Sequence, residues 1–522
     1  MLVAVLWFMG CERASDAPTD PGPTDPSQTD PSSPSDPPDT SGTTPRAGCA
    51  YLDGVARPSL ADALAEAVAG STVAPCPGTH HGAFVASVAV HLVGEPGDRT
   101  RVVLDGDALG TTLTLAPGAV VEDLTIVGGK GQHGGGVALS AGGTATLTRV
   151  TISGSSAQQG GGLWLPDGST VEVIDSELRG NSAADGGGLW AGPGSVVDLT
   201  DTVIVGNNAD RAGGGGYLDG VALAGGTFDG NLANSDYYGT GTAGPLYAAG
   251  LYLTGAGSVV GTVITGNQGG AVAGAAVIDG DQTLVGVRIA ENDGGGGAIG
   301  GLYCESSAVD LGDSEIADNV GAFGGGYLAG CAIRGGVVDG NEGVLFFASG
   351  LMAIGSTLDG VRFEGNTSVL GPVLDLVGGN TVTASTFTGN VHRAGPVLRA
   401  WTGDTIDGCT VEGNVGPVGL EVAAEGVRLT NTTLRDAVDP ASGGGAAVRI
   451  AAQVKLVVEG GALLGSDRGV ALDATLIGAT LELIDVDLGD LGDDNSADVR
   501  WSDGDHEGYG AGTTVSCTDT CR

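Results

Sequence analysis

The sequence predicts an all-β fold in which one chain winds into a parallel β-helix, or solenoid. Ten times along the chain, an apolar residue and two arbitrary residues precede an asparagine, and these asparagines recur about every 25 residues. They are Asn181, Asn207, Asn231, Asn267, Asn292, Asn319, Asn341, Asn366, Asn390 and Asn414. Each interval also contains glycines and short segments with alternating apolar residues. A repeat of this length is typical of solenoids, in which each unit buries its apolar face against its neighbours.

The chain begins with an apolar segment, Leu2 to Met9, which ends in Gly10-Cys11 and is followed at once by polar residues. Residues 1–11 resemble a bacterial lipoprotein signal, with Cys11 as the lipidated residue, although they lack a positively charged start. The alternative is a short uncleaved anchor, but eight apolar residues cannot span a bilayer as a helix. Residues 12–47 are rich in Pro, Thr, Ser and Asp, which predicts a disordered tether. We therefore expect a membrane partner, reached through an N-terminal lipid, and a location in the cell envelope, at the outer membrane or surface of a Gram-negative-type bacterium.

Residues 48–79 predict an N-terminal cap, and residues 80–484 predict the β-helix itself. Within the cap, Ser59 to Ala69 has the pattern of a short amphipathic helix. Each repeat of the β-helix predicts three short strands: one after the glycines, as in Gly160–Leu165, one in the middle, as in Val171–Ile174, and one before the asparagine. These strands can bury their apolar faces only against the equivalent strands of neighbouring coils. The asparagines should then form a ladder of side-chain amides along the stack.

The repeats resemble a known family. The glycine runs, together with segments such as Phe363-Glu364-Gly365-Asn366, are similar to right-handed parallel β-helix repeat proteins, including the glycine-rich and Phe-x-x-Asn repeats of chlamydial polymorphic outer membrane proteins. The resemblance covers roughly residues 120–450. Upstream, Cys76–His80 and Val103–Gly106 look like the N-terminal part of the same broad family, which implies that a short capping helix closes the end of the stack. The motifs imply a fold and no particular activity.

Residues 485–522 predict an acidic C-terminal cap with a terminal cysteine pair. Closely spaced acids between Asp485 and Glu507 could hold calcium, although their spacing does not match known calcium loops, and a solvated acidic surface is the alternative. Calcium is the only cofactor that we consider.

Eight cysteines fit an exported protein with a few disulfides. Three disulfides are predicted: Cys49–Cys76, Cys304–Cys331 and Cys517–Cys521. The middle pair is the least regular, because its two cysteines stand at different distances from the asparagines of their coils. Cys409 is left over, and no cysteine or histidine spacing predicts a zinc site.

With 62 acidic and 21 basic residues, the chain has a net charge of -41. This charge excludes nucleic acid as a natural partner and disfavours anionic polysaccharides. Many β-helix relatives are polysaccharide lyases or glycoside hydrolases of the pectate lyase-like fold, but the clustered acids and bases of such enzymes are not recognisable in this sequence. No catalytic and no metal-binding residue is predicted.

Two features suggest a binding surface. Trp164, Trp190, Tyr252 and Tyr303 occupy the same place in the glycine-led strands, between residues expected to point inward, and Tyr217 and Tyr327 nearly match. Such a row of outward aromatic side chains can bind sugar rings or a protein partner, and the alternative is that the rings only pack on each other.

The second feature is the long interval between Asn231 and Asn267. It is 36 residues long, and it includes Asp236, Tyr237, Tyr238 and Tyr247 as further candidate binding residues. Insertions in solenoids form loops, often on the binding face, although a purely decorative insertion is the alternative. We therefore expect a surface protein with a structural, adhesive, or glycan- or protein-binding role, with a polysaccharide-processing enzyme as the alternative. The oligomeric state is not indicated.

Overall fold

The computed structural model describes most of the chain from Cys49 onward. The described residues are 49–233, 247–269, 271–344, 347–435, 438, 445–450, 454–464, 470–474, 480–484, 486, 497–501, 504–506 and 515–518. The predicted signal segment with Cys11, the predicted tether and Cys521 therefore lie outside the described residues. The same is true of Asp236, Tyr237 and Tyr238 in the long interval.

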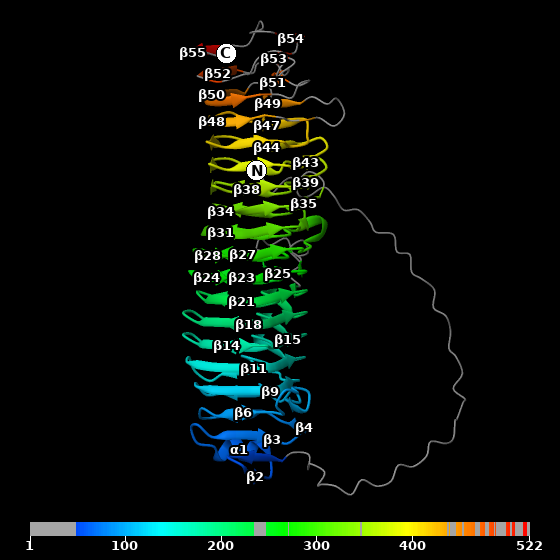
Figure 1. The fold of residues 1–522 in the computed structure, drawn as a ribbon, viewed down its shortest axis with the longest axis vertical. Coiled ribbons are helices and arrows are strands. Elements are labelled where there is room, and N and C mark those ends of the chain that lie inside the picture. Colours follow the sequence, from blue (N-terminus) through cyan, green and yellow to red (C-terminus); the bar gives the residue numbers. More distant parts are fainter. Residues whose placement is uncertain are drawn as a thin grey trace, which may run out of the picture. The chain divides into compact units, whose positions relative to one another are not determined.

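The described chain is almost entirely strand, and successive coils stack in a column with parallel pairing between neighbours (Figure 1). The strands form three sheets along the stack, called sheets 1, 2 and 3 below. Most coils contribute one strand to sheet 1 and one or two strands to sheet 2, and many coils also contribute a short strand to sheet 3. Partners lie one repeat apart, since Leu163 pairs with Leu189 and Leu189 with Gly216. The predicted parallel β-helix is confirmed.

Sheet 1 holds the glycine-led strands: β5 (Phe84–Ala86), β8 (Leu113–Leu115), β10 (Val137–Leu139), β13 (Leu163–Leu165), β17 (Leu189–Ala191), β20 (Gly216–Asp219), β23 (Leu251–Thr254), β27 (Ala275–Ile278), β30 (Leu302–Glu305), β33 (Gly326–Ala329), β36 (Leu351–Ile354), β40 (Leu374–Leu376), β44 (Pro396–Ala400), β47 (Val418–Val422), β49 (Ala446–Ile450), β51 (Val470–Ala474) and β53 (Ala497–Trp501). The last of these also pairs antiparallel with β54 (Gly504–His506).

Sheet 2 holds the strands between sheet 1 and the asparagines: β4 (Gly78–His81), β6 (His91–Val93), β7 (Val102–Asp105), β9 (Ala119–Val127), β11 (Thr144–Ser153), β14 (Thr170–Ile174), β15 (Glu177–Arg179), β18 (Val196–Val205), β21 (Ala222–Asp229), β24 (Gly257–Val260), β25 (Val263–Thr265), β28 (Gln282–Val285), β29 (Arg288–Ala290), β31 (Ala308–Ala317), β34 (Ala332–Asp339), β37 (Thr357–Asp359), β38 (Arg362–Glu364), β41 (Thr381–Thr383), β42 (Thr386–Thr388), β45 (Thr405–Asp407), β46 (Thr410–Glu412), β48 (Val427–Leu434), β50 (Lys455–Leu463), β52 (Thr480–Ile484) and β55 (Val515–Thr518).

Sheet 3 holds the short strands that follow the asparagine turn: β12 (Ser156–Gln159), β16 (Ser182–Asp185), β19 (Asn208–Ala212), β22 (Leu232–Ala233), β26 (Gln268–Gly269), β32 (Val320–Gly321), β35 (Glu342–Gly343), β39 (Thr367–Ser368) and β43 (Val391–His392). A single turn of 3-10 helix, η2 (Gly295–Gly297), follows sheet 3 in one coil.

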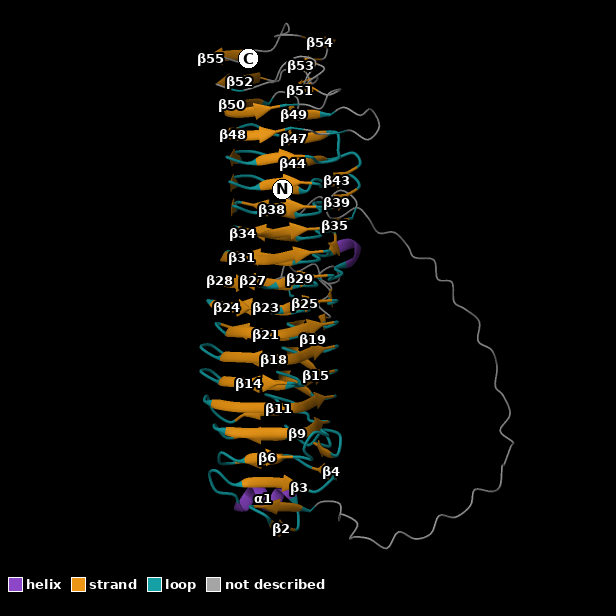
Figure 2. Ribbon diagram, in the orientation of Figure 1, coloured by secondary structure: helices purple, strands orange, loops and turns teal. Residues whose placement is uncertain are grey.

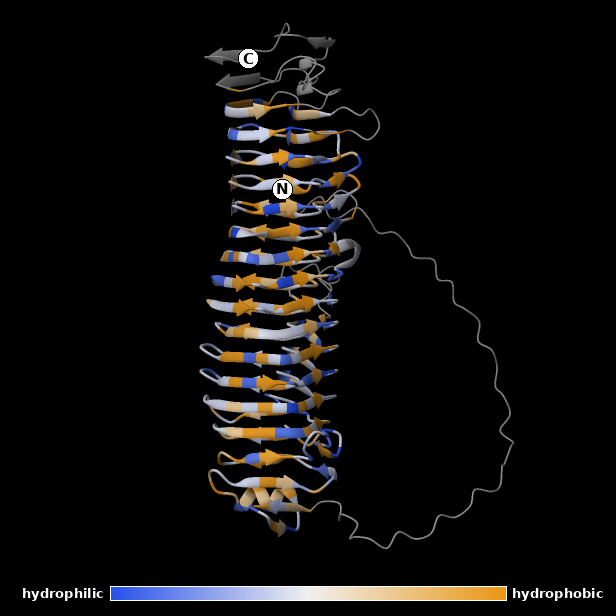
Figure 3. Cartoon of the chain, in the orientation of Figure 1, coloured by the Kyte–Doolittle hydropathy of each residue, from blue (hydrophilic) through white to orange (hydrophobic). Residues whose placement is uncertain are grey.

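The core lies inside the coils, because buried and exposed side chains alternate along the strands. Hydrophobic and hydrophilic residues accordingly occur side by side in the strands of the stack (Figure 3). Leu163 and Leu165 are fully buried, whereas Trp164 between them is half-buried and faces outward. The largest fully buried side chains include Phe228, Phe363 and Phe387, and Phe363 stacks on Phe387 with ring centroids 4.5 Å apart. Burial of one such side chain contributes about 1.5–3 kcal/mol, so the stability of the stack grows with the number of coils.

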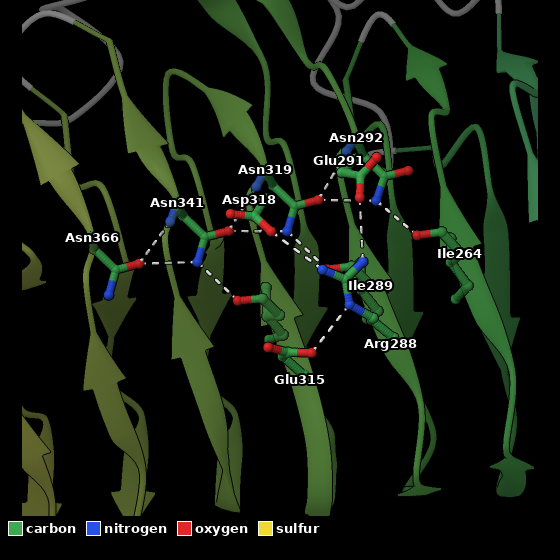
Figure 4. A network of polar contacts seen from close by, with 11 residues as sticks. Ile264, Arg288, Ile289, Glu291, Asn292, Glu315, Asp318, Asn319, Asn341 and Asn366 are labelled. Carbon is green, nitrogen blue, oxygen red and sulfur yellow. Dashed lines mark hydrogen bonds and ion pairs between the residues drawn. The ribbon is translucent and has the colours of Figure 1, made fainter.

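All ten repeating asparagines are buried and form one continuous ladder, part of which is drawn in Figure 4. The side-chain oxygen of Asn207 accepts hydrogen bonds from the backbone nitrogen of Asn181 (2.9 Å) and from its Nδ2 (3.1 Å). The Nδ2 of Asn207 donates to the carbonyl oxygen of Leu178 (2.9 Å) and to Oδ1 of Asn231 (3.0 Å). The side-chain amides therefore form hydrogen bonds with backbone groups of the turns and link neighbouring coils, as predicted.

The N-terminal end of the stack is closed by a short antiparallel cap. Its strands are β1 (Ala50–Leu52), β2 (Val55–Arg57) and β3 (Thr72–Pro75), and its helix is α1 (Leu60–Glu66). Ser59 caps the helix by accepting a hydrogen bond from the backbone nitrogen of Asp62. Leu60 and Leu64 are buried against the first coil, so the helix covers the open end of the core (Figure 2).

Two of the three predicted disulfides lie within the described residues, and both are formed. Cys49 is bonded to Cys76 in the cap, and Cys304 to Cys331, with Cα atoms 5.5 Å and 6.2 Å apart respectively. Cys304 lies in β30, and Cys331 lies in the turn after β33, so the bond crosses to a different position of the next coil. Cys409 is a free, buried cysteine. The third predicted disulfide remains a prediction, because Cys521 is not described.

Candidate functional site

The outer face of sheet 1 carries a row of outward side chains with one residue from each coil. In register from β13 onward, the row consists of Trp164, Trp190, Tyr217, Tyr252, Ala276, Tyr303, Tyr327, Met352, Asp375, Arg399, Glu421 and Arg449. We call these residues the outer row. Its first part is aromatic and its last part is charged. Tyr217 and Tyr327 belong to it fully, which corrects the expectation that they only nearly match.

The aromatic part of the outer row is a stack of rings. Trp164 and Trp190 have ring centroids 5.8 Å apart and an interplanar angle of 14°, and Trp190 and Tyr217 are 6.3 Å apart at the same angle. Tyr217 and Tyr252 follow at 5.0 Å. Because the rings face one another along the stack, a partner would meet ring edges rather than open ring faces. The expected outward row is therefore present, and its rings also pack on each other.

Beyond Tyr217 the row is covered by a small apolar cluster outside the coils. Tyr252 and Tyr303 are only 6% and 5% exposed, and they pack with Val272 and Ile299 from the connections that precede sheet 1. Tyr247, inside the long interval, lies 6.0 Å from Tyr252 between ring centroids. Burial raises the pKa of the Tyr252 phenol, so this hydroxyl stays neutral. The long interval therefore contributes Tyr252 to the outer row and Tyr247 to the residues packed against it.

A buried acid lies beside the aromatic row. Asp185, in β16, is 8% exposed and is ion-paired with Arg211 in the next coil. Burial raises the pKa of its carboxyl, although the charge of Arg211 acts in the opposite direction. Asp185 is also close enough to raise the pKa of Tyr217, after the larger effect of burial on that phenol. The row thus has an aromatic part with one charged pair at its flank.

The charged part of the outer row was not recognised in the sequence. Arg399 lies between two acids of neighbouring coils, with its Nη1 3.6 Å from Oδ2 of Asp375 and its Nε 3.5 Å from Oε1 of Glu421. The indole Nε1 of Trp401, a side chain that is 39% exposed, donates to Asp375 (3.3 Å). Burial raises the pKa of the Asp375 carboxyl. The signal that could have revealed this cluster is an acid or arginine between two inward apolar residues in each successive coil.

Arginines also separate acids on sheet 2. Arg288 pairs with Glu291 (3.5 Å), Glu315 (3.1 Å) and Asp318 (3.2 Å), next to the asparagine ladder (Figure 4). Arg149 donates two hydrogen bonds, of 2.6 and 2.8 Å, to the buried carboxylate of Asp123, and these lower the pKa of that carboxyl. The few basic residues are thus placed where parallel stacking would otherwise bring acids together.

The histidines show no catalytic arrangement among the described residues. His392 is fully buried, its Nδ1 donates to the carbonyl oxygen of Gly395 (2.9 Å), and burial lowers its pKa to about 4. His81 lies at the surface with Asp105 and Asp107, and these three form the only group of possible metal ligands found within the described part of the chain. Exposed acids commonly form such groups without a metal ion. Most of the acidic tail considered for calcium lies outside the described residues.

The fold and the outer row define a β-solenoid repeat protein with a continuous lateral face. No protein-family model matches the chain, and no curated protein matches it either. The similarity to polymorphic outer membrane proteins therefore rests on the repeat motifs alone. No helix in the described part of the chain has the length and apolar character that a membrane crossing requires.

Proposed function

We propose that the chain is an exported, lipid-anchored protein of the bacterial cell surface, whose β-helix binds a glycan or protein partner through the outer row of sheet 1. The observation that supports this role most is the aromatic part of the row. Four aromatic rings in four successive coils form a straight strip, and the rings of Trp164, Trp190 and Tyr217 are only half-buried. Exposed aromatic strips of this kind are enriched at recognition surfaces.

The geometry of the strip limits how a partner binds. Because the ring faces are already stacked, contact is made through ring edges and through the polar groups at the flank, such as Asp185 and Arg211. Tyr247 of the long interval packs against Tyr252 of the same strip, so this interval adds an aromatic residue to the surface. Nucleic acid is not proposed as a partner, because the charge of -41 opposes it.

The binding proposal is tested with Trp164→Ala and Trp190→Ala, each measured on a glycan array and in a pull-down of cell-surface proteins. Tyr51→Ala is the control, because Tyr51 is an exposed aromatic residue of the N-terminal cap and lies outside the outer row. We expect the first two variants to lose retention of the partner and the control to keep it. Unchanged retention in both variants of the strip would count against this surface.

The lipid anchor is tested separately by Cys11→Ala. In a bacterial host we expect the unchanged chain to fractionate with membranes and to incorporate labelled fatty acid, and the variant to do neither. A variant that still incorporates the label at the same level would refute Cys11 as the lipidated residue.

A polysaccharide-processing enzyme is the second candidate, and the charged part of the outer row is what favours it. Asp375, whose carboxyl has a raised pKa, and Glu421 lie two coils apart on either side of Arg399. Two coils correspond to about 10 Å, slightly more than the separation of the two carboxyl groups in inverting glycosidases. Incubation with neutral and acidic glycans, with and without calcium, should then release reducing or unsaturated ends, and Asp375→Asn should abolish the release. If no product is released, the enzymatic candidate is refuted, and the ion pairs of Arg399 with Asp375 and Glu421 have a structural role only.

A further inference from the structure

A groove separate from the outer row runs along the outside of sheet 2, near the N-terminal end. It has a volume of about 520 Å³, within the range of small-ligand sites. Thr125, Thr151, Glu177 and Val203 form its floor, and these residues are neighbours in four successive coils. Three coil-to-coil steps correspond to about 14 Å, so the groove is elongated along the stack. We call it the lateral groove.

One wall of the lateral groove is formed by the connection between β6 and β7. The side chain of Thr125 donates a hydrogen bond to the carbonyl oxygen of Arg99 (2.8 Å), and the Asp123 carboxylate accepts one from the backbone nitrogen of Gly97 (3.2 Å). The guanidinium of Arg99 then reaches Asp175 (3.3 Å), which is 76 residues away in sequence. Hydrogen bonds therefore hold this connection against the coils that follow its own coil in the stack.

The floor contains a polar side chain without a partner. Thr151 is 6% exposed and lies between the inward residues Val150 and Ile152, so its side chain points into the groove. Among the described residues its hydroxyl has no hydrogen-bond partner. The hydroxyl oxygen is not fully buried and is accessible from the groove, so a ligand can form a hydrogen bond with it in place of water.

Both arginines of the groove are paired with acids, and Asp201 is a third acid in its lining. Arg99 is paired with Asp175, and Nε of Arg179 lies 3.3 Å from Glu177. A guanidinium has five donors and a carboxylate about four acceptor positions, so each pair keeps free hydrogen-bonding capacity. Anionic ligands are disfavoured by the net charge of -41. Hydroxyl groups, which donate to carboxylates and accept from guanidinium groups, match this lining.

We infer that the lateral groove binds a short segment of a neutral oligosaccharide, with Thr151 at the centre of the site. The site extends the proposed binding role to a second surface and is physically separate from the aromatic strip. A cationic peptide, which the carboxylates of the groove would also attract, is the alternative that the experiment distinguishes.

The experiment measures binding of neutral oligosaccharides, such as glucan, mannan and xylan fragments, by isothermal titration calorimetry and on a glycan array. Thr151→Val removes the hydroxyl and keeps the shape of the side chain, so folding should be preserved. Thr146→Val is the matched control, because Thr146 is an outward threonine of the same strand that does not line the groove. We expect at least a tenfold loss of affinity for Thr151→Val and for Glu177→Gln, and no change for the control.

Two results would overturn the inference: the unchanged chain binds no neutral oligosaccharide, or Thr151→Val binds as well as the unchanged chain. Binding of a cationic peptide that Thr151→Val leaves intact and Glu177→Gln removes would also overturn it, in favour of the charged alternative. Trp190→Ala is measured in parallel. If only this variant loses the glycan, the aromatic strip is the site and the groove is not; if only Thr151→Val loses it, the groove is the site and the strip is not.

Discussion

Replacement of an asparagine inside the ladder should cost more than replacement of the asparagine at its end. Asn207 has ladder neighbours on both sides, so Asn207→Ala leaves the backbone nitrogen of Asn181 without its acceptor, removes one acceptor of the Asn181 amide, and removes the donor to Leu178. Stranded buried groups of this kind cost about 1–3 kcal/mol each, which predicts a destabilisation of about 4 kcal/mol.

Asn414 is the matched comparison, because it is the last asparagine of the ladder. The Nδ2 of Asn390 keeps two other acceptors, the carbonyl oxygens of Phe363 and Thr388, when Asn414 is removed. The backbone nitrogen of Asn390 and the buried carbonyl oxygen of Phe387 are then left without the bonds that Asn414 made. The carbonyl oxygen of Glu412 also loses a bond, but it is only partly buried. We expect Asn414→Ala to destabilise the chain by about 3 kcal/mol, less than the effect at Asn207, because two buried groups rather than three lose a partner.

The assay must resolve individual coils, because long repeat stacks do not unfold in a single step. Hydrogen exchange followed by mass spectrometry in increasing urea reports the stability of the coils around each substitution. Asn207→Asp is a further test: its second oxygen would face the carbonyl oxygen of Leu178 and the side-chain oxygen of Asn231, so we expect no rescue. Equal losses at Asn207 and Asn414, or a loss below about 1 kcal/mol at Asn207, would refute the reasoning.

Three other predictions concern buried groups. Burial lowers the pKa of His392 from 6.5 to about 4, so the unfolded chain takes up a proton at a higher pH than the folded chain. The contribution of His392 to stability should be complete above pH 6.5 and fall by about 3 kcal/mol as the pH drops to 4. Urea unfolding at pH 7 and 4.5 should show this loss in the unchanged chain and not in His392→Leu. The disulfide between Cys304 and Cys331 closes a loop with a sequence separation of 27, so replacing both by serine should cost about 3.5 kcal/mol in thermal or urea unfolding. A reductant should destabilise the coils of β30 and β33 in the unchanged chain and not in this variant, which keeps only the disulfide of the cap. Arg149→Met leaves the buried Asp123 carboxylate without its partner and should lower the free energy of unfolding by about 3 kcal/mol at pH 7. Adding Asp123→Asn removes the buried charge and should recover most of this loss in urea unfolding. If stability does not recover, the two residues are not coupled.

The sequence was sufficient to predict the coils because each coil repeats the same local signals. The asparagines mark the same turn each time, and their ladder follows from parallel stacking once the repeat is recognised. The helix α1 was also predictable, since Ser59 and the apolar spacing after it are local features.

Features that depend on register between coils were harder to predict. Tyr217 seemed displaced because β19 has one extra residue relative to β16, which shifts the pairing from Ala183 with Ala209 to Asp185 with Ala212. Counting residues from the asparagines cannot reveal such a bulge. The charged row was missed for a related reason: Asp375 and Arg399 become neighbours only when their strands are aligned.

The lateral groove is the least predictable feature. It depends on contact between Arg99 and Asp175, which lie in coils that are not adjacent, and no periodic pattern connects these two residues. Asp175 has a positive φ of 46°, which allows the chain to bend between β14 and β15 and places its carboxylate at the edge of the groove. A local bend and a distant connection must both be known before the site can be seen.

The alternating charges of the outer row limit how a chain of this kind can lengthen by gene duplication. Where coils meet through asparagines or aromatic rings, an identical inserted coil is a suitable neighbour, since like side chains bond or stack with one another. Between Asp375 and Glu421, however, a duplicated coil would place a second arginine next to Arg399, or a second acid next to an acid. Growth in that part is favourable only in pairs of coils, whereas the aromatic part can grow one coil at a time.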